Sequence, residues 1–139
     1  MNENREDSME LNVYVNYKEN CRQAFEFYEK HLGGKITSVT TFGQMLEANA
    51  PKERKDKIVH ARMELGGAVL MGADIPNTEP MRSAYLTLLF DNAKETERIY
   101  QILSEGGEIF MKMEKTSFAE RFAMLRDKFG ASWMLLCEK

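Results

Sequence analysis

The sequence predicts an α+β fold built from two tandem βαβββ modules, because one stretch of the chain repeats the plan of another. Residues 11–36 and residues 83–109 share one order: an extended apolar run, an Asn, an amphipathic helix, a Gly-Gly pair and a new apolar run. Asn20 corresponds to Asn92, and Tyr28 to Tyr100, at the same spacing of 72 residues. A repeat of this period indicates a duplicated structural module.

The length of the chain suits one domain that contains both modules. At 139 residues it can bury about 65–70% of its unfolded surface without a metal or a disulfide. We expect a disordered tail at 1–9 and a single domain at 10–139. Within this domain we expect a first module at 10–75, a linker at 76–82 and a second module at 83–139.

The first module begins with a strand, a helix and a second strand. Residues 11–17 alternate apolar and polar side chains, which is the period of a strand. Asn20 and Gln23 have the spacing of a capping box at a helix start, and Gly33 is placed to end that helix in the left-handed conformation. The second strand is expected at 35–42. The helix should bury Ala24, Phe25, Phe27, Tyr28 and Leu32, which recur at helical spacing.

The rest of the first module is a polar segment followed by a hairpin. Residues 43–57 are polar and charged, which indicates a mobile surface loop and a candidate lid. Residues 58–65 and 68–74 are two strands, and Gly66-Gly67 between them accepts the positive φ angles of a tight turn. They are therefore expected to pair antiparallel.

The second module repeats this order after the Pro-containing linker. A strand is expected at 83–90, a helix at 93–105 with Asn92 and Glu95 as its capping box, and a strand at 108–114 after Gly106-Gly107. A final hairpin, 121–126 with 132–138, completes the module.

Charge and composition exclude several classes of partner. The net charge is −3 and the two signs are interspersed, so no basic face is available for nucleic acid. The N-terminal ten residues are polar, and no run approaches the roughly 18 apolar residues of a membrane span. The two cysteines, Cys21 and Cys137, lack metal-type spacing and are expected to be reduced thiols. A cytoplasmic protein without membrane contact is the expected class.

The central hairpin carries the candidate polar site. A two-residue turn pairs Leu65 with Ala68 and Arg62 with Met71, and paired residues share a face. His60, Arg62 and Glu64 then lie on one face, opposite the apolar face that contains Met63. An imidazole beside a guanidinium can act as an acid or base, or hold an anion. One alternative is that the three side chains lie at a solvated sheet edge. Another is that His60 only bonds a backbone carbonyl at the rim of a barrel. His31 is interpreted as a favourable charge at a helix C-terminus.

Three segments resemble one protein family. VYVNYKENCRQAFEFYEKHLGGKI, IVHARMELGGAVLMGAD and SFAERFAMLRDKFGASWML are similar to the vicinal oxygen chelate superfamily, which includes glyoxalase I, extradiol dioxygenases and bleomycin and fosfomycin resistance proteins, and within it to the PhnB-like branch. The resemblance covers about 10–138. It implies that each module curls into a half-barrel whose concave face lines a cavity, with the helix on the convex face.

The resemblance also indicates where the family's metal ligands would lie in this sequence. Metal-using members place His and Glu ligands at the middle of the first and fourth strands of each module, and those positions carried over are Val13, Met71, Tyr85 and Met134. These residues do not offer the several N, O or thiolate donors that a divalent ion needs. No metal and no cofactor are therefore expected. Instead, Val13, Met71, Tyr85 and Met134 are expected to bind a ligand in the cavity, where the two Met side chains would give a soft lining. Phe118 and Phe122 would form apolar wall, and Glu120 and Arg121 an ion pair at its rim.

Together these features favour a metal-independent, PhnB-like, small-molecule-binding homodimer that sequesters an anionic or aromatic metabolite or drug. One alternative is a glyoxalase-like lyase or isomerase, or a dioxygenase-type enzyme, that uses His60, Arg62 and Glu64, with or without a metal. Another is a scaffold with no ligand. No G-x-S-x-G, phosphate loop or Cys-His pair supports covalent catalysis. Whether modules pair within or between chains stays open.

Overall fold

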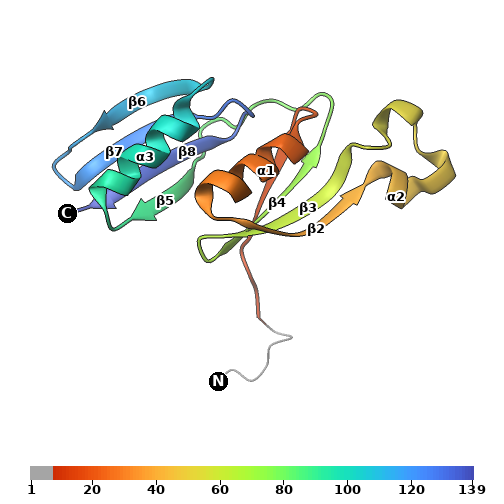
Figure 1. Ribbon diagram of the computed structural model, residues 1–139, viewed down its shortest axis with the longest axis horizontal. Coiled ribbons are helices and arrows are strands. Elements are labelled where there is room, and N and C mark those ends of the chain that lie inside the picture. The colour runs from red at the N-terminus through yellow and green to blue at the C-terminus, as the bar shows by residue number, and fades with distance from the viewer. Residues whose placement is uncertain (1–7) are drawn as a thin grey trace.

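Two four-stranded sheets, each crossed by one helix, form the two modules (Figure 1). The structure is a computed structural model, and it describes residues 8–139, so most of the predicted tail at 1–9 lies outside the described residues. The first sheet has the order β1-β4-β3-β2 and the second the order β5-β8-β7-β6. β1 pairs with β4, and β5 with β8, in parallel, while the other pairs are antiparallel. The elements are β1 (Val13–Tyr17), α1 (Cys21–Leu32), β2 (Lys35–Thr41), β3 (Ile58–Leu65) and β4 (Ala68–Asp74), then β5 (Leu86–Phe90), α3 (Ala93–Ser104), β6 (Glu108–Glu114), β7 (Ala119–Arg126) and β8 (Ser132–Glu138).

This arrangement confirms the duplicated βαβββ plan. The β3–β4 hairpin has the predicted register, with Met63 opposite Leu70 and Arg62 opposite Met71, and Gly66 and Gly67 both have positive φ angles. The two ends of the second module differ from expectation. β5 begins at Leu86, so Tyr85 lies just before it, and β7 begins two residues earlier than predicted, at Ala119.

The first sheet is buried on the side that α1 covers. Met63 and Ala61 are fully buried there with Phe25 and Tyr28 of the helix. Gly72 of β4 belongs to the same face, because a Cβ at this position would come within 3.0 Å of the Phe25 ring. The sheet and the helix therefore approach more closely than any side chain larger than hydrogen would allow.

The N-terminus of α1 is capped differently from the prediction. Asn20 makes no side-chain hydrogen bond to the helix, and its Oδ1 is buried without a partner among the described residues. The backbone N–H of Cys21 donates instead to Asp74 Oδ1 at 2.8 Å, and the other carboxylate oxygen accepts from the N–H of Ile58 at 2.7 Å. The predicted Asn20–Gln23 box is thus wrong. The Asp74 carboxylate at the end of β4 takes its place, and its negative charge is attracted to the positive end of the helix dipole.

At α3 the prediction holds in part. Asn92 Oδ1 accepts from the Glu95 N–H at 2.9 Å, as in a capping box. The Glu95 carboxylate, however, pairs with Arg98 one turn on. At α1 the predicted C-terminal cap is confirmed, since Gly33 has φ 78° and its N–H bonds to the Tyr28 carbonyl.

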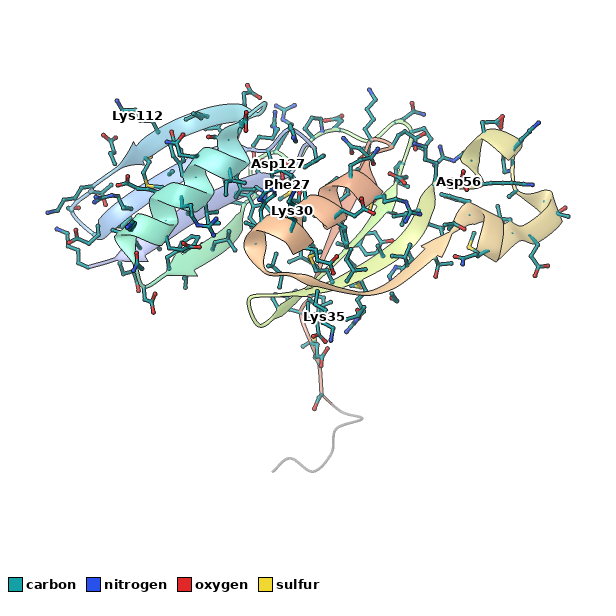
Figure 2. All side chains as sticks on the ribbon, viewed as in Figure 1. Phe27, Lys30, Lys35, Asp56, Lys112 and Asp127 are labelled. Atoms are coloured by element: carbon teal, nitrogen blue, oxygen red, sulfur yellow. The ribbon has the colours of Figure 1, made fainter. Side chains whose placement is uncertain are left out.

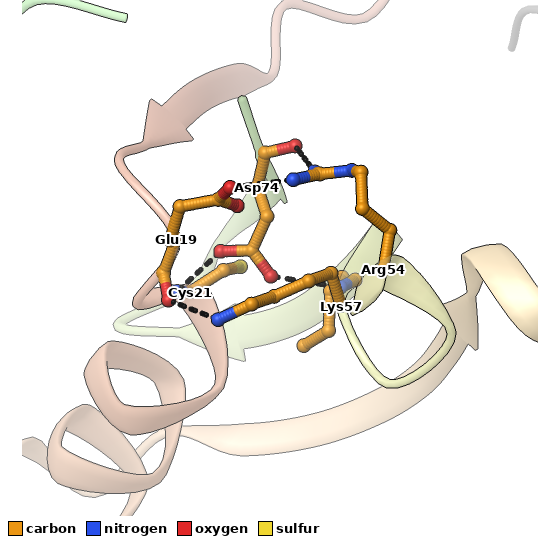
Figure 3. Close-up of polar contacts among 6 residues, drawn as sticks. Glu19, Cys21, Arg54, Lys57 and Asp74 are labelled. Carbon is orange, nitrogen blue, oxygen red and sulfur yellow. Dashed lines mark hydrogen bonds and ion pairs between the residues drawn. The ribbon is translucent and has the colours of Figure 1, made fainter. Parts of the chain in front are cut away.

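Residues 42–57 contain regular structure where a surface loop was expected at 43–57, while mobility and a role as a lid stay predictions. They form the short helix α2 (Phe42–Leu46), with a complete capping box between Thr41 and Gln44, and two 3₁₀ turns, η2 (Glu47–Asn49) and η3 (Lys52–Arg54). Figure 3 shows how their far end is tied to the start of α1. Arg54 pairs with Glu19 at 2.5 Å and donates to the Asp74 carbonyl, and Lys57 donates to the Glu19 carbonyl.

The two modules meet where α1 packs on the β7–β8 turn. Tyr28 donates a 2.6 Å hydrogen bond to Asp127 Oδ2, which also accepts from the indole N–H of Trp133 at 2.8 Å. Phe27 packs on Phe129 with 5.4 Å between ring centres, and Figure 2 places Phe27 and Asp127 together at this junction. Helix α1 thus serves both modules. In the described part of the chain, no helix has the length and apolar character needed to cross a membrane.

Candidate functional site

Each sheet has one face that no helix covers. Figure 1 shows α1 and α3 on the same side of their sheets, with the sheets side by side. The opposite faces of both sheets therefore point away from the helices. We call them the first open face (β1–β4) and the second open face (β5–β8).

The first open face carries the predicted polar residues. Cross-strand pairing places Tyr14, Met71, Arg62 and Ser38 in one row across all four strands. His60 lies beside this row, opposite Thr40, and Glu64 lies opposite Val69. His60 and Arg62 are half-buried, while Glu64 is exposed. The predicted register of the β3–β4 hairpin, and with it the shared face of His60, Arg62 and Glu64, is therefore confirmed.

Tyr14 is the site residue that sequence reasoning missed. Its hydroxyl lies 3.5 Å from His60 Nδ1 and 3.4 Å from the Val59 carbonyl, at the long end of hydrogen-bond distances. Partial burial raises the pKa of Tyr14, so the phenol stays protonated and can donate. The signal was present in the alternation of β1, because Tyr14 has the parity opposite to the buried Val15 and Tyr17.

Val13 and Met71 do not share a face, which corrects the carried-over positions. Val13 pairs with Leu70 on the helix side, whereas Tyr14 pairs with Met71 on the first open face. Val13 instead lies with Tyr85 in an apolar groove of about 290 Å³ between the modules, together with Leu86 and Trp133. As ligand-binding residues, Val13 and Tyr85 stay predictions, and they are separate from the His60–Arg62 face.

The second open face is mainly apolar. Met134 pairs with Thr87 on one side and Met124 on the other, and Leu136 pairs with Phe122. Phe118 lies before β7, 58% exposed, with its ring 5.3 Å from that of Phe122. This face presents thioether, aliphatic and aromatic side chains where the first open face presents polar ones.

The predicted rim pair of Glu120 and Arg121 is wrong. Arg121 forms its ion pair with Glu97 of α3 and contacts Glu120 only through the backbone carbonyl. Glu120 lies at a register shift of β7, between the pairs made by Ala119 and Arg121. A β-bulge of this kind changes which side chains reach each face.

The residues at the family's metal positions do not fit a divalent ion. The residues that pair with Met71 and Met134 in the two parallel ladders are Tyr14 and Thr87, and not the expected Val13 and Tyr85. A phenol, a hydroxyl and two thioethers are not the donor set of Zn²⁺, Mn²⁺ or Fe²⁺. Among residues 8–139, no three His, Cys, Asp or Glu side chains are grouped to hold a metal.

Comparison with known proteins shows which family the chain resembles. The model of the Glyoxalase/Bleomycin resistance protein/Dioxygenase superfamily matches residues 11–135. Protein PA1353 from Pseudomonas aeruginosa, whose crystal structure is known, is 36% identical in sequence to this chain. The two structures match with a TM-score of 0.82 over 94% of this chain and 98% of that one. Protein YjdN of Escherichia coli strain K12 is 28% identical over 144 residues, covering 91% of this chain and 94% of YjdN.

A third similarity concerns the fold alone. The PhnB protein from Bacillus cereus is 21% identical, with a TM-score of 0.79 over 93% of this chain and 99% of that one.

Proposed function

Because this chain belongs to the Glyoxalase/Bleomycin resistance protein/Dioxygenase superfamily, we propose that it is a PhnB-like protein that binds and sequesters a small anionic or aromatic metabolite or drug without a divalent metal. The observation that carries the proposal is the row of Tyr14, Met71 and Arg62 on the first open face, with His60 beside it. Arg62 supplies a permanent positive charge, and Tyr14 supplies a protonated donor. Met71 lies between them as an apolar contact.

Metal independence is supported by the donors at the family's metal positions. Thioethers at Met71 and Met134 are soft, weak ligands and better suited to contact with an aromatic or aliphatic ligand body. The test is elemental analysis of the purified protein. A stoichiometric amount of Zn, Ni or Fe, or a melting temperature lowered by a chelator, would overturn this part of the proposal.

The cavity is proposed to form between two chains. In one chain the open faces lie side by side rather than opposite each other (Figure 1). A homodimer that places the first open face of one copy over the second open face of the other would enclose a polar wall opposite an apolar wall. It would also cover Leu89 and Met111, which are 68% and 42% exposed. Sedimentation as a monomer at micromolar concentration would contradict this arrangement.

The location proposed is the cytoplasm. Cys21 and Cys137 are both free and buried, which suits a reducing compartment.

The binding proposal is tested by a thermal-shift screen of small carboxylates, phosphates and aromatic acids, followed by an Arg62→Ala variant. We expect Arg62→Ala to weaken the best ligand by about 1.5–3 kcal/mol, the range of a hydrogen bond to a charged group. The fold should persist, because Met63 and Leu65 on the helix side are unchanged. Arg98→Ala is the matched control, since Arg98 is an exposed arginine on α3 paired with Glu95. Equal loss of affinity in both variants would remove Arg62 from the site.

The alternative function is an enzyme of the glyoxalase-like lyase, isomerase or dioxygenase type that uses His60, Arg62 and Glu64. The contact between Tyr14 and His60 favours it, because a phenol beside an imidazole can share a proton with a bound substrate. His60→Ala separates the two functions. Under the binding proposal it lowers affinity slightly and there is no turnover to lose, whereas an enzyme would lose turnover with affinity retained.

A further inference from the structure

A polar hollow of about 190 Å³ lies where the linker enters the second module. Two guanidinium groups line it, those of Arg82 and Arg126, and no carboxylate does. The hydroxyl-bearing residues Ser83, Ser132 and Tyr85 line it as well. We propose that this hollow binds a small oxyanion, a phosphate or carboxylate group, held by Arg82 and Arg126.

The Arg126 guanidinium is fixed in position before any ligand arrives. It donates to the Met81 carbonyl at 2.8 Å and to Glu108 Oε1 at 3.1 Å. Its central carbon also lies 5.2 Å from the centre of the Phe110 ring. An arginine held by three contacts loses little conformational freedom when an anion binds, which favours affinity.

The hydrogen-bonding capacity of Arg126 is not fully used. Its Nε is buried and has no partner among the described residues. Water does not reach this Nε, so an anion in the hollow must contact the guanidinium through Nη1 and Nη2. Each of these nitrogens makes one hydrogen bond, to Glu108 and to the Met81 carbonyl, and keeps a second N–H that an oxyanion can accept.

Arg82 supplies the second charge from the exposed side of the hollow. Within residues 8–139, no carboxylate lies at ion-pair distance from it, whereas Arg126 shares its charge with Glu108. The hollow therefore keeps a positive charge that a single anion can neutralise. It is independent of the proposed function, because Arg62 and His60 lie on the first sheet and none of the residues named here does.

The test is an NMR titration of the full, ¹⁵N-labelled chain with inorganic phosphate, and separately with acetate, at constant ionic strength set by sodium chloride. We expect saturable shifts of the Arg126 Nε–H resonance and of the backbone amides of Arg82, Ser83 and Ser132. The anion that binds more tightly identifies the head group. Arg82→Gln and Arg126→Lys should each weaken binding about tenfold or more, since each removes part of a charge-assisted contact. Arg98→Gln, the matched control at an exposed arginine of α3 paired with Glu95, should bind as the wild type does.

Two results would overturn the proposal. One is the absence of saturable shifts at these residues with both anions. The other is wild-type affinity in Arg82→Gln. Arg126 also holds the linker, so Arg126→Lys counts only if its spectrum is that of a folded protein. Arg82 is exposed, and its variant carries the test alone in that case.

Discussion

The corresponding residues Asn20 and Asn92 look alike in the sequence, but only one of them caps a helix. Asn92 accepts a hydrogen bond from the third residue of α3, and Asn20 accepts none at α1. A cap within four residues is a local feature that a pattern can predict. At α1 the acceptor is Asp74, which is 53 positions from its donor Cys21, so only the folded sheet can reveal it.

This difference gives opposite expectations for two matched substitutions. Asn92→Ala should lower the free energy of unfolding by about 1 kcal/mol, the usual cost of losing an N-cap. Asn20→Ala should change it by less than about half of that, because no capping bond is lost. Urea unfolding of both variants measures the two values. Equal losses would mean that Asn20 caps α1 in solution.

Cys21 makes stability depend on alkaline pH. Burial, and then the negative charge of Asp74, raises the pKa of its thiol from 9.0 to about 12. Above pH 9 the unfolded thiol releases its proton while the folded thiol keeps it, so the free energy of unfolding falls as pH rises. The slope from one group is at most about 1.4 kcal/mol per pH unit.

Cys21→Ala should therefore flatten the loss of stability between pH 9 and pH 12, even if it lowers stability at pH 7. Burial also raises the pKa of Tyr17 and of Tyr28, so the remaining loss should begin above the ordinary tyrosine value near 10. Urea unfolding at several pH values compares the slopes. An unchanged slope between pH 9 and pH 10 in the variant would show that the Cys21 thiol does not titrate in this way.

At the scale of elements, a strand register could be predicted where a tight turn joins the two strands and not where the strands are far apart in the sequence. The Gly66-Gly67 turn predicts the β3–β4 register, because a two-residue hairpin allows few alternatives. β1 reaches β4 through α1 and two further strands, so no turn sets that parallel register. A shift of one residue reverses every face, and this is why Tyr14, rather than Val13, lies beside Met71.

The short helices in segment 42–57 were not predicted, for a related reason. The polar composition of the segment is typical of a loop, yet it is bonded to Glu19 and Asp74, which lie outside it. Arg54 provides the link, and its guanidinium also lies 4.8 Å from the centre of the Phe42 ring.

Arg54→Met should therefore loosen this segment without unfolding the sheets. We expect faster amide hydrogen exchange across 42–57, with β3 and β4 unchanged, because local contacts set the opening free energy of a segment. Lys52→Met is the control, since Lys52 is exposed and lies on the same 3₁₀ turn. Exchange equally fast in both variants would mean that Arg54 does not anchor the segment.

At the scale of the whole molecule, the repeat predicted two modules but not how they join. Tyr28 and Tyr100 are equivalent in the sequence. Only Tyr28 reaches a buried carboxylate of the other module, Asp127, which is 3% exposed. That carboxylate also accepts from Trp133 and from the backbone N–H groups of Phe129 and Ala131. Duplication explains why the two modules have the same elements. At the junction, however, equivalent residues of the two modules make different contacts.

Tyr28→Phe should therefore cost more than Tyr100→Phe. Removing the Tyr28 hydroxyl takes one donor from a buried carboxylate, and we expect the free energy of unfolding to fall by about 1.5–3 kcal/mol. Tyr100 is half-buried and makes no side-chain hydrogen bond among the described residues, so its loss should cost below about 0.5 kcal/mol. Urea unfolding measures both variants. If the two losses are equal, the Tyr28–Asp127 bond does not hold the modules together.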